Sequence, residues 1–310
     1  MTKHRKQAPW LRGRERQLVL LEFALIGGVL TGMFYGFLAV GLNLVFGVLR
    51  FVNLAHGSVV VLGSYLTWEL SNTWHLNPLI AGLIAFPPSL VLGAVIFYAV
   101  TPRLQRSSDP EMLSLILFFG IAQAIEAVTT IVFTSNRRAL PESSLGASSV
   151  SILGQRYPFY WVLGAAIAVP VFGAIYIYLY RTRLGLATRA VMSSPDDAAS
   201  VGIDVKRVSA ICLGVGLFLA ASAGSLSIFI RGGTDPAQGV AVTTFAFTVI
   251  VIGGLGNPIS SIAGGVVLGC AYNLAQAYAP SWSGVIPYGL LLAVMLIRPS
   301  GLFGSQIRVA

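Results

Sequence analysis

The candidates for chemistry in this chain are ionisable and amide side chains that lie inside apolar runs. Glu126 lies within ILFFGIAQAIEAVTTIVF, and the spacing of Gln123, Glu126 and Thr130 places all three on one face of a helix. A charged group inside a hydrocarbon layer is costly, so such a residue is first considered for a functional role. Two interpretations stay open: this face lines a polar pathway, or it holds a neighbouring helix by hydrogen bonds.

Two short apolar segments, 41–57 and 241–257, are interrupted by Gly, Asn, His and Pro and look too short or too broken for ordinary spans. Irregular backbone at membrane depth is tolerated only where protein or a water-filled cavity satisfies its polar groups. Broken helices at matching places in two halves point to a transport pathway. The alternatives are kinked but ordinary helices, and a structural role for His56 as the cap of a broken helix. The pathway candidates are Asn43, Asn53, His56, Ser58, Gln123, Glu126, Gly254 and Asn257.

Motifs for catalysis or cofactor binding are absent from the sequence. It contains no GxxxxGK[ST] phosphate loop, no HExxH pair and no Cys/His metal spacing. The GGLG run at Gly253 lacks the spacing and the strand–turn–helix setting of a dinucleotide site. We therefore expect no cofactor and no metal in this chain. If the protein works against a gradient, the energy must come from a partner or from ion coupling.

The composition places these residues in a membrane protein. The chain has 310 residues, of which 55% are hydrophobic and 10% charged, whereas soluble domains average about 25% charged residues. No Asp, Glu, Lys or Arg occurs from Pro236 to Ile297. The net charge of +9 does not indicate nucleic-acid binding, because nearly all Lys and Arg flank apolar runs.

The lengths of the apolar runs predict an all-α polytopic protein in the lipid bilayer, with about eight spanning helices plus the two broken segments. A repeated order of span, broken return, span and span suggests two pseudo-repeat halves. The predicted spans are 18–40, 58–74, 78–100, 111–133, 158–180, 208–230, 258–279 and 283–297.

The distribution of basic residues predicts the topology. We expect a basic N-terminus (1–17), a transmembrane domain (18–300) that contains an insert at 181–207, and a tail at 301–310, with the insert and both termini cytoplasmic. The loop with Arg103 and Arg106 is then inside and 134–157 outside. This topology requires 41–57 and 241–257 to return across the membrane.

The insert 181–207 carries a compact helix signal between two charge-free spans. Ser194 is a good N-cap, Pro195 suits the first helical position, and Asp196 and Asp197 fill the first turn, where the helix dipole favours acids. Gly202 can end the helix. Such a helix, tethered at both ends, is suited to act as a lever for a cytoplasmic partner. The alternative is a plain solvated loop.

Three segments together resemble one protein family. GLNLVFGVLRFVNLAHGSVVVLGSY, AFTVIVIGGLGNPISSIAGGVVLG and the insert from RTRLGLATRAV through DDAASVGIDVKRV resemble the LivH-type permeases of branched-chain amino acid ABC importers, in that family's order and spacing. The resemblance implies a subunit without enzymatic activity, in a bacterial inner membrane. Its implied partners are a second homologous permease, two cytoplasmic ATPases that bind ATP and Mg²⁺, and an extracytoplasmic substrate-binding protein.

The resemblance also assigns roles to residues of the insert. The coupling helix maps to about Pro195–Val201, which agrees with the capping signals. The residues implied in or beside the ATPase contact are Arg189, Pro195, Asp196, Asp197, Ala199 and Gly202.

The substrate stays open at this stage. Close family members usually carry an acidic residue after NxAHG, where this chain has Ser58. The family moves branched-chain and other amino acids, urea, short amides and organic acids. The alternative function is an ion-coupled secondary transporter with Glu126 or Glu22 as the proton site. A membrane-embedded enzyme would need a nucleophile–base or metal constellation, which the sequence lacks.

Overall fold

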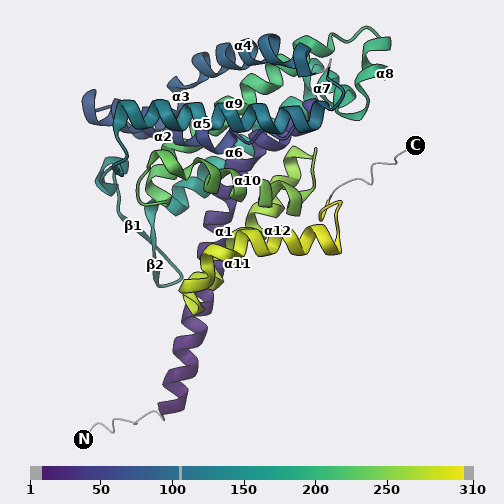
Figure 1. The fold of residues 1–310 in the computed structure, drawn as a ribbon. Coiled ribbons are helices and arrows are strands. Elements are labelled where there is room, and N and C mark those ends of the chain that lie inside the picture. The colour runs from purple at the N-terminus through teal and green to yellow at the C-terminus, as the bar shows by residue number, and fades with distance from the viewer. Residues whose placement is uncertain (1–8, 105–106, 304–310) are drawn as a thin grey trace, which may run out of the picture.

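The computed structural model describes residues 9–104 and 107–303, and most of them are helical (Figure 1). The first helices are α1 (Pro9–Leu49), α2 (His56–Thr73), α3 (Pro78–Ile84), α4 (Phe86–Leu104) and α5 (Pro110–Phe133). Then follow α6 (Phe159–Arg181), α7 (Arg183–Ser193), α8 (Pro195–Ser200), α9 (Val205–Ile230), α10 (Gly239–Gly253), α11 (Ser261–Tyr278) and α12 (Ile286–Ile297). The short elements are β1 (Ser149–Ile152), β2 (Gln155–Pro158) and the 3-10 turns η1 (Glu142–Leu145), η2 (Pro236–Gln238), η3 (Pro258–Ser260) and η4 (Pro280–Val285).

The all-α polytopic fold is confirmed. Within the described residues, 8 helical segments are long and apolar enough to cross a membrane. The set of candidate spans differs from the prediction in one place. Residues 236–253 are long and apolar enough to span the membrane, whereas α2, predicted as the span 58–74, is not. The reason is that α2 carries Glu69 and several Ser, Thr and Asn residues. Much of this helix is buried within the protein, where protein contacts replace lipid.

The prediction that 41–57 forms a separate, broken return is wrong. Helix α1 continues without interruption to Leu49, through Gly41, Asn43 and Gly47. These glycines serve close packing instead of a break. A Cβ on Gly41 would lie 2.6 Å from the carbonyl oxygen of Gly216 in α9. Because α1 shows no break at this place, the proposed pseudo-repeat order is not matched by the first half of the chain.

The true break in this region is the short stretch from Arg50 to Ala55. Arg50 adopts φ 55°, in the left-handed region, and helix α2 begins at His56. The second predicted break is where we expected it, since α10 ends at Gly253 and Gly254 adopts φ 122°. Here too the preceding segment is regular helix, so the irregular backbone is confined to 254–257.

The bundle has two ends, which we call the α8 end and the hairpin end. At the α8 end, Arg50 donates hydrogen bonds to Met192 O and Ser193 O of α7. At the hairpin end, Gln155 of β2 donates to Val19 O, and Tyr278 donates to Gln17 O. Figure 1 shows α7 and α8 at the right and β1–β2 at the left, with the first turns of α1 projecting beyond the other helices.

The described part of the N-terminal segment lies at the opposite end from the insert, which contradicts the predicted topology. Gln17 and Val19 are at the hairpin end, while α7 and α8 are at the other. The prediction needed two crossings between residues 18 and 57, and the continuous α1 makes only one. Phe303, the last described residue, donates to Gly253 O and lies at the α8 end, the same end as the insert; the side of the membrane on which this end lies stays a prediction. Residues 1–8, Arg106 and 304–310 lie outside the described residues.

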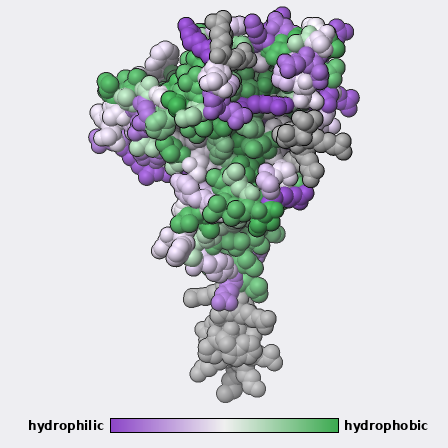
Figure 2. Space-filling model, turned by 45° about the vertical axis from the view of Figure 1, so that its right-hand side comes forward, coloured by the Kyte–Doolittle hydropathy of each residue, from purple (hydrophilic) through white to green (hydrophobic). Residues whose placement is uncertain are grey.

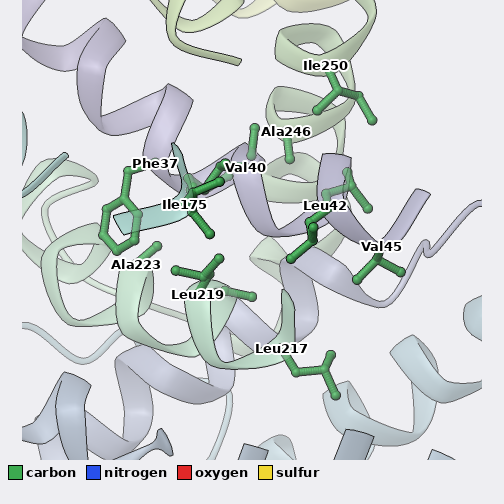
Figure 3. Close-up of a cluster of buried hydrophobic side chains, with 14 of the residues drawn as sticks. Phe37, Val40, Leu42, Val45, Ile175, Leu217, Leu219, Ala223, Ala246 and Ile250 are labelled. Atoms are coloured by element: carbon green, nitrogen blue, oxygen red, sulfur yellow. The ribbon is translucent and has the colours of Figure 1, made fainter. Parts of the chain in front are cut away.

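The core lies where α1 meets α6, α9 and α10 (Figure 3). Leu42 and Val45 of α1 are buried there with Leu217 and Leu219 of α9. On another face, α1 approaches α11 through small residues: a Cβ on Gly32 would lie 2.6 Å from Gly265 O. Small residues allow such close helix packing in lipid. Figure 2 shows hydrophobic residues over the middle of the molecule and down its narrower lower part, as expected for a surface in contact with lipid.

Candidate functional site

Asn43 of α1 holds the second backbone break in place. Its Nδ2 lies 2.8 Å from Asn257 O, 3.2 Å from Gly254 O and 3.0 Å from the hydroxyl of Ser261. Its Oδ1 accepts a 2.8 Å bond from Gly256 N. The side chain is fully buried, so both halves of the amide are used by the protein. The structure thus brings Asn43, Gly254 and Asn257 together, and it uses Asn43 to satisfy the broken backbone.

Asn53, His56 and Ser58 lie in or beside the first break, and all three are buried. Asn53 Oδ1 accepts from Ala55 N at 3.0 Å, which forms the turn that starts α2. The ring of His56 is fully buried, and its Nε2 lies 2.8 Å from Leu38 O. Ser58 is also buried, and a Cβ on Gly239 would lie 2.5 Å from its hydroxyl. Helix α2 has Ala55 as its N-cap without a side-chain cap, and the His56 ring contacts the backbone of α1, so His56 ties the start of α2 to α1 and does not cap the helix.

Thr243 of α10, which the sequence analysis did not single out, joins the first break to the second half of the chain. Its hydroxyl accepts from Gly57 N at 2.9 Å and lies 3.0 Å from Leu54 O. A Cβ on Gly57 would lie 2.4 Å from Thr243 N. Sequence alone could not have found this contact, because a threonine inside an apolar helix has no distinctive local pattern.

Gln123 and Glu126 make no hydrogen bond to either break among the described residues, although α5 packs Phe118 and Ala122 against Phe51 and Ala55 of the first break. They lie on α5, where Gln123 is exposed and Glu126 half-buried in the single chain. The hydroxyl of Thr130 donates to the backbone carbonyl of Glu126 at 2.8 Å, a contact inside the helix. α5 therefore presents this polar face outward, toward lipid or a partner.

Because of this outward position, Glu126→Gln is expected to leave transport by the assembled protein within about twofold of wild type. The amide keeps the size of the side chain and one acceptor oxygen, and it removes the charge and the site for a proton. The measurement is solute uptake by proteoliposomes at two external pH values. A loss of most of the uptake, or of its pH dependence, would instead assign Glu126 to a proton-coupled pathway.

The insert forms two helices, and the predicted α8 is one of them. Ser194 accepts from Asp197 N at 3.3 Å as the N-cap, and Pro195 is the first residue of the helix. Only Ala198 of this helix is buried. Asp196, Asp197, Ala199 and the following Gly202 are exposed, and Gly202 adopts φ 85°. The sequence signals for this short helix are confirmed.

Helix α7 was not predicted, and it changes the interpretation of Arg189. Thr182 caps α7 by accepting from Gly185 N at 2.9 Å, which is the signal that sequence reasoning missed. Arg189 donates to Leu179 O at 3.0 Å, and its guanidinium lies 4.7 Å from the ring centre of Tyr180. Arg189 therefore fixes α7 against the end of α6, and its guanidinium is directed into this chain.

A cavity of about 600 Å³ lies at the hairpin end, between α1, α6, α9, α10 and α11. The sequence analysis did not predict it, because the lining residues come from segments far apart in the sequence. Nearby, Tyr157 stacks on Phe23, with ring centres 4.9 Å apart. Burial raises the pKa of the Tyr157 hydroxyl, and the carboxylate of Glu22 raises it further. The lining includes Phe23, Tyr35, Arg137, Trp161, Arg231, Phe245, Tyr272, Asn273 and Gln276.

Comparison with known proteins gives a consistent result. The family described as "Branched-chain amino acid transport system / permease component" matches residues 24–295. The permease protein LivH of Escherichia coli (strain K12) is 27% identical over 290 residues, covering 90% of this chain and 94% of LivH. BraD of Pseudomonas aeruginosa is 26% identical over 292 residues, covering 90% of this chain and 94% of BraD.

A more distant similarity extends to a second type of permease. LivM of Escherichia coli (strain K12) is 24% identical over 298 residues, covering 87% of this chain and 68% of LivM. LivH, BraD and LivM are each named as permease proteins of high-affinity branched-chain amino acid transport systems. No solved structure matches the chain.

Proposed function

The chain belongs to the family of permease components of branched-chain amino acid transport systems, and from this premise we propose that it forms part of a translocation pathway driven by separate ATPase subunits. Branched-chain amino acids, or related small polar solutes such as urea, amides and organic acids, are the proposed cargo. The names of the relatives support the first of these. ATP and Mg²⁺ would be bound by the partner ATPases, in a bacterial inner membrane.

The observation that carries the proposal is the way α7 and α8 are joined to the first backbone break. α8 exposes Asp196 and Asp197 at one end of the bundle. The guanidinium of Arg50 bonds the last carbonyls of α7, at 3.4 Å from Met192 O and 3.2 Å from Ser193 O. Arg50 is also the first residue of the break that leads to His56. A force on α8 would therefore reach this break through one hydrogen-bonded residue.

A second connection links α7 to the other break. A cavity of about 330 Å³ is lined by Arg189, Met192, Ser193, Leu255, Asn257 and Phe303, among others. Movement of α7 against the 254–257 segment would therefore change the surroundings of the backbone that Asn43 holds. Irregular segments at the ends of packed helices are common places for such switching.

The same geometry supports a proposal for which end of the bundle faces which side of the membrane. If the ATPases bind at α8, the α8 end is cytoplasmic and the hairpin end faces the extracytoplasmic binding protein. The described start of α1 is then on the outer side, against the positive-inside bias of its sequence. A second, homologous permease would complete the pathway.

The experiment is purification of the chain from its native membrane in mild detergent, with mass spectrometry of the proteins that accompany it. Two ATPase copies and a second permease are expected. ATP-dependent uptake by the reconstituted complex is the functional readout. Recovery of the chain alone, with uptake driven by a proton gradient, would replace this proposal with the ion-coupled transporter.

A further inference from the structure

The hairpin-end cavity carries positive charge without a carboxylate in its lining. Arg137 and Arg231 both line it, and none of the other lining residues is acidic. Arg137 donates a hydrogen bond to the backbone carbonyl of Arg231, which holds the two residues beside each other. Two neighbouring guanidinium groups without an acidic partner in the lining favour an anionic ligand.

Arg231 has unused hydrogen-bonding capacity at this place. Its Nε is buried and has no hydrogen-bond partner among the described residues. Its guanidinium carbon lies 5.7 Å from the ring centre of Phe245, so the ring supports the charged group from one side. Buried polar groups are normally hydrogen-bonded, so no bond to this nitrogen competes with a ligand for the guanidinium of Arg231.

Aromatic rings form an apolar wall beside the charge. The ring centres of Tyr35 and Phe245 are 5.2 Å apart, and those of Phe245 and Tyr272 are 5.4 Å apart. Trp161 and Phe23 line the cavity from α6 and α1, with ring centres 6.1 Å apart. Such a wall suits an aliphatic or aromatic body and not a small, fully polar solute.

The polar groups of α11 are already fixed by contacts within the protein. Asn273 donates to the hydroxyl of Thr31 at 2.7 Å and to Gly269 O at 3.0 Å. Gln276 donates to the hydroxyl of Tyr272 at 3.1 Å. These bonds use both N–H groups of Asn273 and one of Gln276, and the two arginines are the charged donors of the lining.

From these observations we propose that the hairpin-end cavity is a binding site for a carboxylate with an apolar body. Arg231, supported by Arg137, binds the carboxylate, and the rings of Tyr35, Phe245 and Tyr272 contact the body. Because the lining has no acid, an α-ammonium group is not required for binding. Its biological role rests on the proposed function: the site would be where the solute first binds on the outer side of the permease. The binding chemistry can be tested independently of that role.

The test measures equilibrium binding to the complete purified complex in lipid nanodiscs, without ATP and without a binding protein. The probes are leucine, 4-methylpentanoate, which lacks the ammonium group, and leucinamide, which lacks the carboxylate. Saturable binding of leucine and 4-methylpentanoate is expected, and leucinamide should bind at least about tenfold more weakly, as for loss of a charged hydrogen bond. Equal binding of leucine and leucinamide, or no saturable binding of the two acids, would overturn the proposal.

Arg231→Gln is expected to weaken binding of both acids by about 10- to 100-fold and to leave the weak binding of leucinamide unchanged. Arg156→Gln is the matched control, because Arg156 is an exposed arginine of β2 that does not line the cavity. Unchanged affinity for the acids in an intact Arg231→Gln complex would refute the assignment. If the Arg231→Gln complex does not assemble, the binding of the three probes to the wild-type complex still tests whether the site selects a carboxylate.

Failure of the proposed function would look different. Proteoliposomes from the same preparation are assayed for ATP-driven uptake with the binding protein added. If the complex binds carboxylates selectively but shows no ATP-driven uptake, the binding-site proposal is supported and the proposed permease role in an ATPase-driven system is refuted. If Arg231→Gln leaves ATP-driven uptake unchanged and binding shows no selectivity for carboxylates, the proposed transport role is supported and the binding-site proposal is refuted.

Discussion

Reversing the two exposed acids of α8, in Asp196→Lys with Asp197→Lys, is expected to lower ATP-driven uptake by about tenfold or more, which corresponds to about 1.4 kcal/mol. Both side chains point away from the protein, and like charges brought together at an interface cost several kcal/mol. The ATPases should therefore copurify in smaller amounts. The measurements are uptake by proteoliposomes and the ratio of ATPase to permease after purification.

The permease itself should remain folded in this double variant. Ser194 still caps α8, and each lost acid at a helix N-terminus costs only about 0.3–1 kcal/mol. Glu111→Lys is the matched control: Glu111 is an exposed acid in the first turn of another helix, α5. Normal uptake and normal ATPase recovery in the double variant would show that α8 is not the docking element.

Replacing Asn43 by alanine is expected to destabilise the folded chain by about 3 kcal/mol or more. The change leaves the N–H of Gly256 without its buried acceptor, which costs about 1–3 kcal/mol. It also removes the bonds to the carbonyls of Gly254 and Asn257, worth about 0.5–1.5 kcal/mol each, although both carbonyls keep the hydroxyl of Ser260. The thermal midpoint can be followed in detergent with a thiol-reactive dye, because Cys212 is buried and reacts when the fold opens.

The matched control is Asn77→Ala at an exposed position. Asn77 also bonds backbone, accepting from Leu79 N at 2.9 Å as the N-cap of α3. Water can replace that bond, so a loss of about 1 kcal/mol is expected. If Asn43→Ala shifts the thermal midpoint no more than Asn77→Ala does, Asn43 is not the structural centre of the second break, and a direct role toward the solute regains support.

The two proposed sites, α8 and the hairpin-end cavity, differ in how far the sequence alone predicts them. The residues of α8 were found because capping is local: Ser194, Pro195 and the two aspartates act within one helical turn, and the structure places them as predicted. The cavity with Arg231 could not be found in this way. Its wall combines residues of α1, α6, α9, α10 and α11, and their proximity depends on how the helices pack.

The sequence by itself determined the class of the protein and much of its helical content. Long runs without charge have no stable alternative to membrane-spanning helices, because lipid offers no partner for exposed backbone groups. The second break also followed from local chemistry, since glycines and Pro258 interrupt the helix after Gly253.

Only the tertiary structure decided the path of the chain between residues 17 and 57, and with it the end at which the N-terminal segment begins. Gly41 and Gly47 suggested a broken return, but these glycines are where α1 touches α9 and the 254–257 segment. A glycine in a helix has the same local preference whether it marks a kink or admits a neighbouring backbone. The partner that settles the question is separated by most of the chain, as Asn43 and Asn257 are, and no local pattern encodes that contact.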